Sequence, residues 1–279
     1  MPARATWSAF APHGRRTSVA VPAPSALPLA EQVVIVTGGA RGLGAHISRA
    51  FLGAGARVAI AYHRSGAAAD ALAAAHPGRA LPVAVDIRDR GQVEDLVAAT
   101  EQHFGEPVTT IVNNALVDFT FDGDARPKAH ELTTERLMGQ FAGTVHGPLH
   151  LVQAARPGMV NRGFGRIVNI GTNLVQHPVV PYHDYTASKA ALLALTRTLA
   201  HDLGPDGITV NMVSGGLLRT TDASAATPPA VFDMIAAATP LGRVITPVEL
   251  ADTVLFFASP WARAVTGQNL IVDGGLVKG

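Results

Sequence analysis

The chain has 279 residues, of which 48% are hydrophobic, and its formal net charge is +1 at pH 7. This composition provides a large core but no strongly basic surface, so we expect neither nucleic acid nor a membrane as a partner. The sequence has no cysteine and no HExxH-type pairing among its 11 histidines, which excludes disulfides and cysteine chemistry and leads us to expect no metal site.

Residues 1–30 differ in composition from the rest of the chain. They are rich in proline, alanine and arginine and show no periodic apolar pattern. The pair Arg15-Arg16 is typical of twin-arginine export signals, but prolines interrupt the apolar stretch that would have to follow it. We therefore expect residues 1–30 to form a flexible extension and the protein to stay in the cytoplasm.

From residue 33 onward, short apolar strands alternate with helical patterns. The expected strands are residues 33–37, 57–62, 80–87, 108–115, 165–172, 208–216 and 269–275. The clearest helical stretches between them are residues 92–104, 134–159 and 185–203. Apolar strands separated by helices imply a parallel sheet that is covered on both faces. We predict a single α/β domain over residues 31–279: a doubly wound, Rossmann-like fold with a seven-stranded parallel sheet and helices on both faces.

A glycine-rich turn, TGGARGLG at residues 37–44, directly follows the first strand. Its glycines allow a tight turn and a close approach of the backbone to a pyrophosphate at a helix N-terminus. The position of the turn in the first βαβ unit predicts a dinucleotide site. The residues that we expect to contact the nucleotide there are Gly38, Ala40, Arg41, Gly42, Leu43 and Gly44.

The end of the second strand indicates which nucleotide is bound. Sites for NAD place an acid about 20 residues after the glycine turn, but Tyr62 occupies that place here. Arg64 and Ser65, together with Arg41 from the glycine turn, are suited to a 2′-phosphate, so we predict NADP(H) as the cofactor. A solvent-exposed helix-start residue is the alternative interpretation of Arg64.

The end of the third strand supplies a second nucleotide contact. Asp86 and Ile87 lie where the strand should meet an adenine. The alternative for Asp86 is the N-cap of the next helix.

The stretch PYHDYTASKAAL at residues 181–192 carries the candidate catalytic groups. Tyr185 and Lys189 are four residues apart at a helix start and therefore share one face. A free tyrosine has a pKa near ~10, and a neighbouring ammonium lowers it. Thr172, at the end of the fifth strand, offers a hydroxyl to hold a substrate carbonyl oxygen.

These residues resemble the short-chain dehydrogenase/reductase family. The resemblance extends from about residue 32 to residue 279 and rests on TGGARGLG, NNA at 113–115, IVNIGT, YTASK, GITVN and VDGG. It implies that Tyr185 is the general acid that protonates the carbonyl oxygen as hydride arrives. It also implies that Lys189 binds the nicotinamide ribose and lowers the pKa of Tyr185, and that Thr172 binds the substrate oxygen. Further nucleotide contacts implied by the resemblance are Asn113, Asn114, Ala115, Gly216, Leu218 and Thr220.

The neighbours of Tyr185 are weaker candidates. Tyr182 has no lysine four residues further on, and His183 and Asp184 are adjacent residues without a nucleophile elbow, so they do not form a hydrolase triad. We expect Asp184 to be a helix-start residue.

The sequence departs from the family pattern at four positions. Thr172 replaces a serine, and Thr144 stands where the family usually has an asparagine that supports a proton-relay water; we count Thr144 among the catalytic residues. Leu116 and Gly215 replace a common glycine and proline.

The expected activity is NADPH-dependent reduction of a ketone to a secondary alcohol. The sequence looks most like 3-oxoacyl-(acyl-carrier-protein) reductases of fatty acid biosynthesis, which implies a small-molecule or carrier-bound acyl substrate and a homotetramer. Residues 217–242, rich in small residues and threonine, are expected to form a mobile lid. Two alternatives remain: oxidoreduction of another secondary alcohol, and a cofactor-binding regulator with little turnover.

Overall fold

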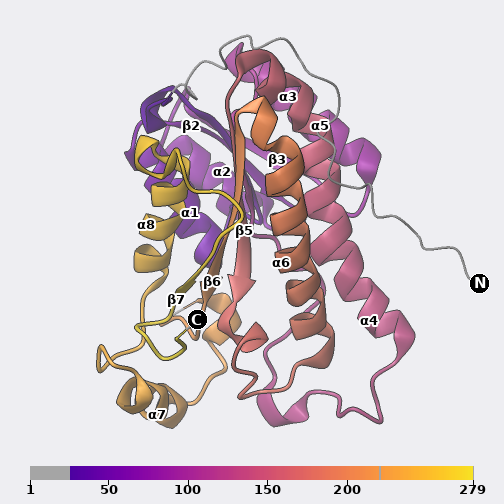
Figure 1. Cartoon of the computed structure of the whole chain (residues 1–279), viewed down its shortest axis with the longest axis vertical. Coiled ribbons are helices and arrows are strands. Elements are labelled where there is room, and N and C mark those ends of the chain that lie inside the picture. Colours follow the sequence, from indigo (N-terminus) through magenta and orange to yellow (C-terminus); the bar gives the residue numbers. More distant parts are fainter. Residues whose placement is uncertain (1–25, 220, 279) are drawn as a thin grey trace, which may run out of the picture.

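A single parallel sheet organises the chain in the computed structural model, which describes residues 26–219 and 221–278 (Figure 1). Its strand order is β3-β2-β1-β4-β5-β6-β7, and every neighbouring pair is parallel. The strands are β1 (Val33–Thr37), β2 (Arg57–Tyr62), β3 (Ala80–Ala84), β4 (Thr110–Asn113), β5 (Gly165–Thr172), β6 (Ile208–Gly215) and β7 (Asn269–Val272). The predicted doubly wound, seven-stranded Rossmann-like fold is therefore confirmed.

Helices cover both faces of the sheet. They are α1 (Gly42–Gly53), α2 (Gly66–Ala74), α3 (Arg90–Phe104), α4 (Thr134–Phe141), α5 (Gly147–Arg162), α6 (His183–Leu203), α7 (Pro229–Ala238) and α8 (Pro247–Ala258). The stretch predicted as one helix over residues 134–159 is two helices, because a π-helical turn at Ala142–His146 separates α4 from α5. Among the described residues, no helix combines the length and apolarity that crossing a bilayer would require.

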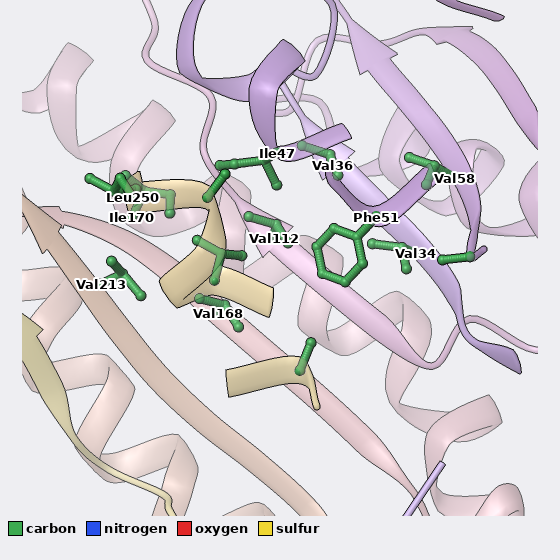
Figure 2. Packing of buried hydrophobic residues seen from close by; sticks show 14 of the residues in the cluster. Val34, Val36, Ile47, Phe51, Val58, Val112, Val168, Ile170, Val213 and Leu250 are labelled. Carbon is green, nitrogen blue, oxygen red and sulfur yellow. The ribbon is translucent and has the colours of Figure 1, made fainter. Parts of the chain in front are cut away.

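The alternation of side chains along the strands produces two core layers. In β1, Val34 and Val36 face the layer under α1 and α8, where they join Phe51 (Figure 2). Val33 and Ile35 face the opposite layer, under α3, α5 and α6. Successive side chains of a strand point to opposite faces, so a strand covered on both sides is apolar throughout.

The chain enters the sheet from a short anchored segment. Leu27 is buried, and its carbonyl accepts a hydrogen bond from the side-chain amide of Gln32 at 3.0 Å. The same amide donates to the carbonyl of Ala258 at 2.9 Å. Residues 26–30 of the predicted extension thus contact the domain, whereas residues 1–25 lie outside the described part of the chain.

Candidate active site

The three residues with the clearest catalytic chemistry meet at the carboxyl end of β5. Thr172 ends this strand, while Tyr185 and Lys189 lie in the first two turns of α6. The side chain of Thr172 lies at the hydroxyl of Tyr185, where it acts to lower the pKa of the tyrosine. The ammonium of Lys189 donates to the carbonyl of Ile170 at 2.6 Å and lies 5.8 Å from the centre of the Tyr185 ring. The structure therefore brings together the residues that the sequence singled out.

Burial controls the protonation of this group. Tyr185 is 6% exposed and Lys189 is 4% exposed. Burial raises the pKa of Tyr185 to about 12, against an opposing hydrogen bond from Thr172, and it lowers the pKa of Lys189 to about 8. Desolvation therefore dominates at Tyr185, and the ammonium of Lys189 is held at the Ile170 carbonyl, so the expected lowering of the Tyr185 pKa by Lys189 stays a prediction.

Thr144 lies in the π-helical turn between α4 and α5. It is 3% exposed, and the turn packs against α6, the helix that carries Tyr185. Single π-helical turns often occur at functional sites. The catalytic role of Thr144 stays a prediction.

The neighbours of Tyr185 have structural partners. The hydroxyl of Tyr182 accepts a hydrogen bond from the backbone N–H of Gly123 at 2.8 Å. Asp184 is buried in the first turn of α6, where its carboxylate accepts from Arg136 Nε at 2.7 Å and from the N–H of Tyr185 at 2.9 Å. Asp184 is therefore a helix-start residue, as expected, and also joins α6 to α4.

Two phenylalanines that the sequence reasoning missed cover the candidate acid. The ring of Phe119 stacks on Tyr185 with centroids 4.8 Å apart, and Phe121 meets the same ring edge-on at 5.3 Å. The sequence does show two nearby aromatic residues in the connection after β4. This segment has no regular pattern that would predict where their side chains lie.

The glycine turn after β1 has the geometry of a phosphate cradle. Gly38 and Gly42 have positive φ values of 63° and 52°. A Cβ on Gly44 would lie 2.0 Å from the Gly38 carbonyl oxygen, so only glycine fits there. The side-chain amide of Asn114 donates to the carbonyl of Thr37 at 3.0 Å and fixes the start of the turn. The turn leads into the N-terminus of α1, which is suited to bind a phosphate.

The other predicted residues near this turn occupy varied environments. Arg41 is the N-cap residue of α1, Ala40 is buried and Leu43 is half-buried. Ser65 is the N-cap residue of α2, although its side chain makes no capping hydrogen bond. Ile87 is buried against the start of α5. Their contacts with a nucleotide stay predictions.

Ion pairs connect the residues predicted for the adenosine end. Arg64 Nη2 lies 3.7 Å from a carboxylate oxygen of Asp118, and Arg88 Nη1 lies 2.9 Å from the other. Arg88 also binds Asp86 at 2.7 Å, and this hydrogen bond lowers the pKa of Asp86 to about 2. The N-cap of α3 is Asp89, so the alternative interpretation of Asp86 as that cap is wrong.

The NNA motif at the end of β4 organises the edge of the sheet. The side-chain amide of Asn113 donates to Asn169 Oδ1 of β5 at 2.8 Å. The N–H groups of Asn114 and Ala115 donate to the hydroxyl of Thr37 at 3.0 and 3.1 Å. These side chains hold the ends of β1, β4 and β5 in register.

The segment after β6 packs tightly against the end of β5. A Cβ on Gly216 would lie 2.9 Å from Asn173 Nδ2 and from Asp273 Cβ, so this position requires glycine. Leu218 is buried. Thr220, predicted to lie against the nicotinamide, is outside the described residues.

Known proteins resemble this chain over most of its length. A family model described as enoyl-(acyl carrier protein) reductase matches residues 38–277. An acetoacetyl-CoA reductase of Rhizobium meliloti is 34% identical over 248 residues, which cover 88% of this chain and 98% of that protein.

Two solved structures share the fold. A short-chain dehydrogenase/reductase mutant of Serratia marcescens is 33% identical with a TM-score of 0.79, over 90% of this chain and 99% of that one. A blue fluorescent protein from a metagenomic library, in complex with NADPH, is 34% identical with a TM-score of 0.80, over 90% of this chain and 100% of the other.

Because the pKa of Lys189 is lowered in the folded protein, the free energy of unfolding should depend on pH. Between a folded pKa of about 8 and an unfolded value of 10.5, the unfolded chain holds a proton that the folded protein lacks. Without nucleotide, the free energy of unfolding of the wild type should therefore rise relative to Lys189→Met by about 2 kcal/mol from pH 8 to pH 10. Urea unfolding of both proteins across this range measures the difference. A constant or shrinking difference would show that Lys189 stays fully charged in its buried place.

Proposed function

Because the chain belongs to the short-chain dehydrogenase/reductase family, whose members are oxidoreductases acting on CH–OH groups, we propose that it reduces a 3-oxoacyl thioester to the secondary alcohol with NADPH. The observation that carries the proposal is the buried group of Thr172, Tyr185 and Lys189 at the same sheet edge as the glycine turn.

The residues present fit a bound dinucleotide. Gly38 and Gly42 adopt positive φ values that favour glycine, and a Cβ on Gly44 would meet the carbonyl oxygen of Gly38, so the turn keeps the tight form in which its backbone can approach a pyrophosphate. When bound, NADPH supplies the hydride. The turn and the N-terminus of α1 would hold its pyrophosphate, and Lys189 would hold the nicotinamide ribose.

The protein's own groups would handle the carbonyl oxygen. The hydroxyls of Thr172 and Tyr185, which lie next to each other, would bind it. With a pKa of about 12, Tyr185 carries its proton at neutral pH and donates it to the oxygen as negative charge develops there. Burial keeps water away from this transfer. Thr172 would thus take the role of the serine that it replaces, and this supports an enzyme over a regulator with little turnover.

The choice of NADPH over NADH rests on the end of β2. Tyr62 stands where an acid would bind the ribose 2′-hydroxyl, and Arg64 follows with an exposed guanidinium. The NADPH complex of the metagenomic blue fluorescent protein supports this choice.

The choice of substrate rests on a relative. Acetoacetyl-CoA, named in the Rhizobium meliloti relative, is a 3-oxoacyl thioester. A carrier-bound acyl chain, a role in fatty acid synthesis and a cytoplasmic location belong to the same proposal. Another secondary alcohol remains the alternative substrate.

We also propose a homotetramer. Phe256 of α8, Trp261 in the following turn and Leu270 of β7 are large apolar side chains that remain 37%, 80% and 43% exposed. β7 is the last strand of the sheet, and contact with a second copy would cover these apolar side chains.

Cofactor preference is the first test. We expect kcat/KM with NADPH to exceed that with NADH by more than about tenfold, or ~1.4 kcal/mol. Arg64→Ala should narrow this ratio, because it removes the cation that would bind the 2′-phosphate. Arg49→Ala, which removes an exposed arginine from the middle of α1, should leave the ratio unchanged. Equal values for the two cofactors in the wild type would contradict the proposal.

The general acid is the second test. Tyr185→Phe should lower the rate of NADPH oxidation with acetoacetyl thioesters by about 10²-fold or more and leave NADPH affinity unchanged. Tyr182→Phe is the matched control. It loses only the bond to the Gly123 N–H and should keep most of the turnover. A Tyr185→Phe enzyme with most of its activity would show that another group is the acid.

The assembly is the third test. Light scattering at micromolar concentration should give the mass of four chains for the wild type. Trp261→Glu should lower the mass, because it places a charge on the proposed contact, whereas Gln102→Glu, an exposed change on α3, should not. A monomeric wild type would refute the tetramer.

A further inference from the structure

The connection between β4 and α4 brings two aromatic rings onto the catalytic tyrosine. Phe119 lies nearly parallel to the Tyr185 ring, with an interplanar angle of 24°, and Phe121 meets it at 78°. The two phenylalanines also contact each other with centroids 4.9 Å apart. Together they form an apolar wall, defined here as Phe119 and Phe121, that leaves Tyr185 only 6% exposed.

The residues just before the wall in the sequence are held in place by contacts with other elements. Gln140, buried in α4, donates its side-chain amide to the carbonyl of Val117 at 3.0 Å. Asp118 is the only described non-glycine residue with a positive φ, 47°, and Arg88 holds its carboxylate at 2.9 Å. An unfavourable backbone conformation persists only where surrounding contacts determine it.

The wall is fixed on the other side as well. The N–H of Gly123 donates to the hydroxyl of Tyr182 at 2.8 Å, and the Tyr182 ring contacts both phenylalanines. Arg126 Nε donates to the carbonyl of Pro181 at 3.3 Å. The wall is thus joined to the start of α6, the helix that carries Tyr185.

The wall limits the space beside the reacting carbonyl. Thr172 is at the hydroxyl end of Tyr185, and its methyl group occupies volume that a serine would leave open. With the carbonyl oxygen at the hydroxyls of Thr172 and Tyr185, a group attached to the carbonyl carbon on the side of the Tyr185 ring would lie against Phe119, which stacks on that ring. Alkyl groups suit this surface, because they bury no polar atom without a partner.

We propose that Phe119 and Phe121 are specificity-determining residues, which restrict the ketone to one with a small alkyl group, of methyl or ethyl size, on the wall side of its carbonyl carbon. A flat ring in that place would have to displace Phe119 from its stack on Tyr185. This inference rests on the proposed function, because it uses Tyr185 and Thr172 to position the carbonyl oxygen.

A pair of thioesters that differ only at this group tests the proposal. The probes are the 3-oxobutanoyl and 3-oxo-3-phenylpropanoyl esters of the same thiol, which place a methyl or a phenyl on the reacting carbon. The wild type should prefer the methyl compound. Phe119→Ala should raise the ratio of kcat/KM for phenyl over methyl by at least about tenfold, the scale of discrimination in an apolar pocket.

Two further variants separate the wall from a general effect on folding. Phe119→Leu keeps bulk without a flat ring and should change the ratio much less than Phe119→Ala. Phe104→Ala makes the same substitution in a half-buried phenylalanine at the end of α3, away from Tyr185, and should leave the ratio unchanged. A ratio that Phe119→Ala leaves unchanged, or that Phe104→Ala shifts equally, would overturn the proposal.

A second readout needs no turnover. Because burial raises the pKa of Tyr185 to about 12, Phe119→Ala should admit water and lower this pKa towards its ordinary value of 10.0. Ultraviolet difference titration to about pH 11, against Tyr185→Phe in each background, measures the change. If neither the wild type nor any variant reduces either thioester but the titration shifts as expected, the proposed function is wrong, whereas the covering of Tyr185 by Phe119 is confirmed. An unchanged titration would contradict the wall itself.

Discussion

All seven strands run in the same direction, and this constraint determines where every functional group lies. The carboxyl ends of parallel strands meet at one edge, so the glycine turn after β1, the asparagines that end β4 and Thr172 at the end of β5 become neighbours. Bonds between strand ends then fix their spacing. The amide of Asn113 reaches Asn169, and the hydroxyl of Thr37 accepts the N–H groups that follow β4. Figure 1 shows α7 and the connection before α4 at this same end of the molecule.

Burial sets the protonation states of the catalytic groups at this edge of the sheet. Tyr185 and Lys189 begin α6 but face the sheet, where water does not stabilise their charged forms. The tyrosine therefore keeps its proton, as an acid for ketone reduction must, and the lysine is held at a backbone carbonyl. The aromatic wall of Phe119 and Phe121 narrows access to the site. It also excludes water from the proton transfer and selects ketones by the size of the group on the carbonyl carbon. The phenylalanines that we propose to select the substrate thus also keep the catalytic tyrosine dry.

Local patterns in the sequence were sufficient to predict most of the fold and the residues at the centre of the candidate site. Apolar runs located the strands, the glycines located the turn, and the four-residue spacing placed Tyr185 and Lys189 on one helical face. Features that depend on distant partners were not predictable. The π-helical turn around Thr144 interrupts a stretch with an ordinary helical pattern, and Arg88 binds the carboxylate of Asp118 across 30 positions of the chain. Phe119 reaches Tyr185 across 66 positions through a connection with no regular period, so only the folded chain reveals the contact.

We propose that NADPH bound at this edge of the sheet transfers a hydride to the carbon of a carbonyl group whose oxygen is bound by Thr172 and Tyr185. Label transfer tests it most directly. NADPH deuterated at both hydrogens of C4 is incubated with the enzyme and a 3-oxobutanoyl thioester, and the product is analysed by mass spectrometry and NMR. We expect a 3-hydroxybutanoyl thioester with a single deuterium, bonded to C3. Tight NADPH binding without transfer of deuterium to this or any related ketone would contradict it.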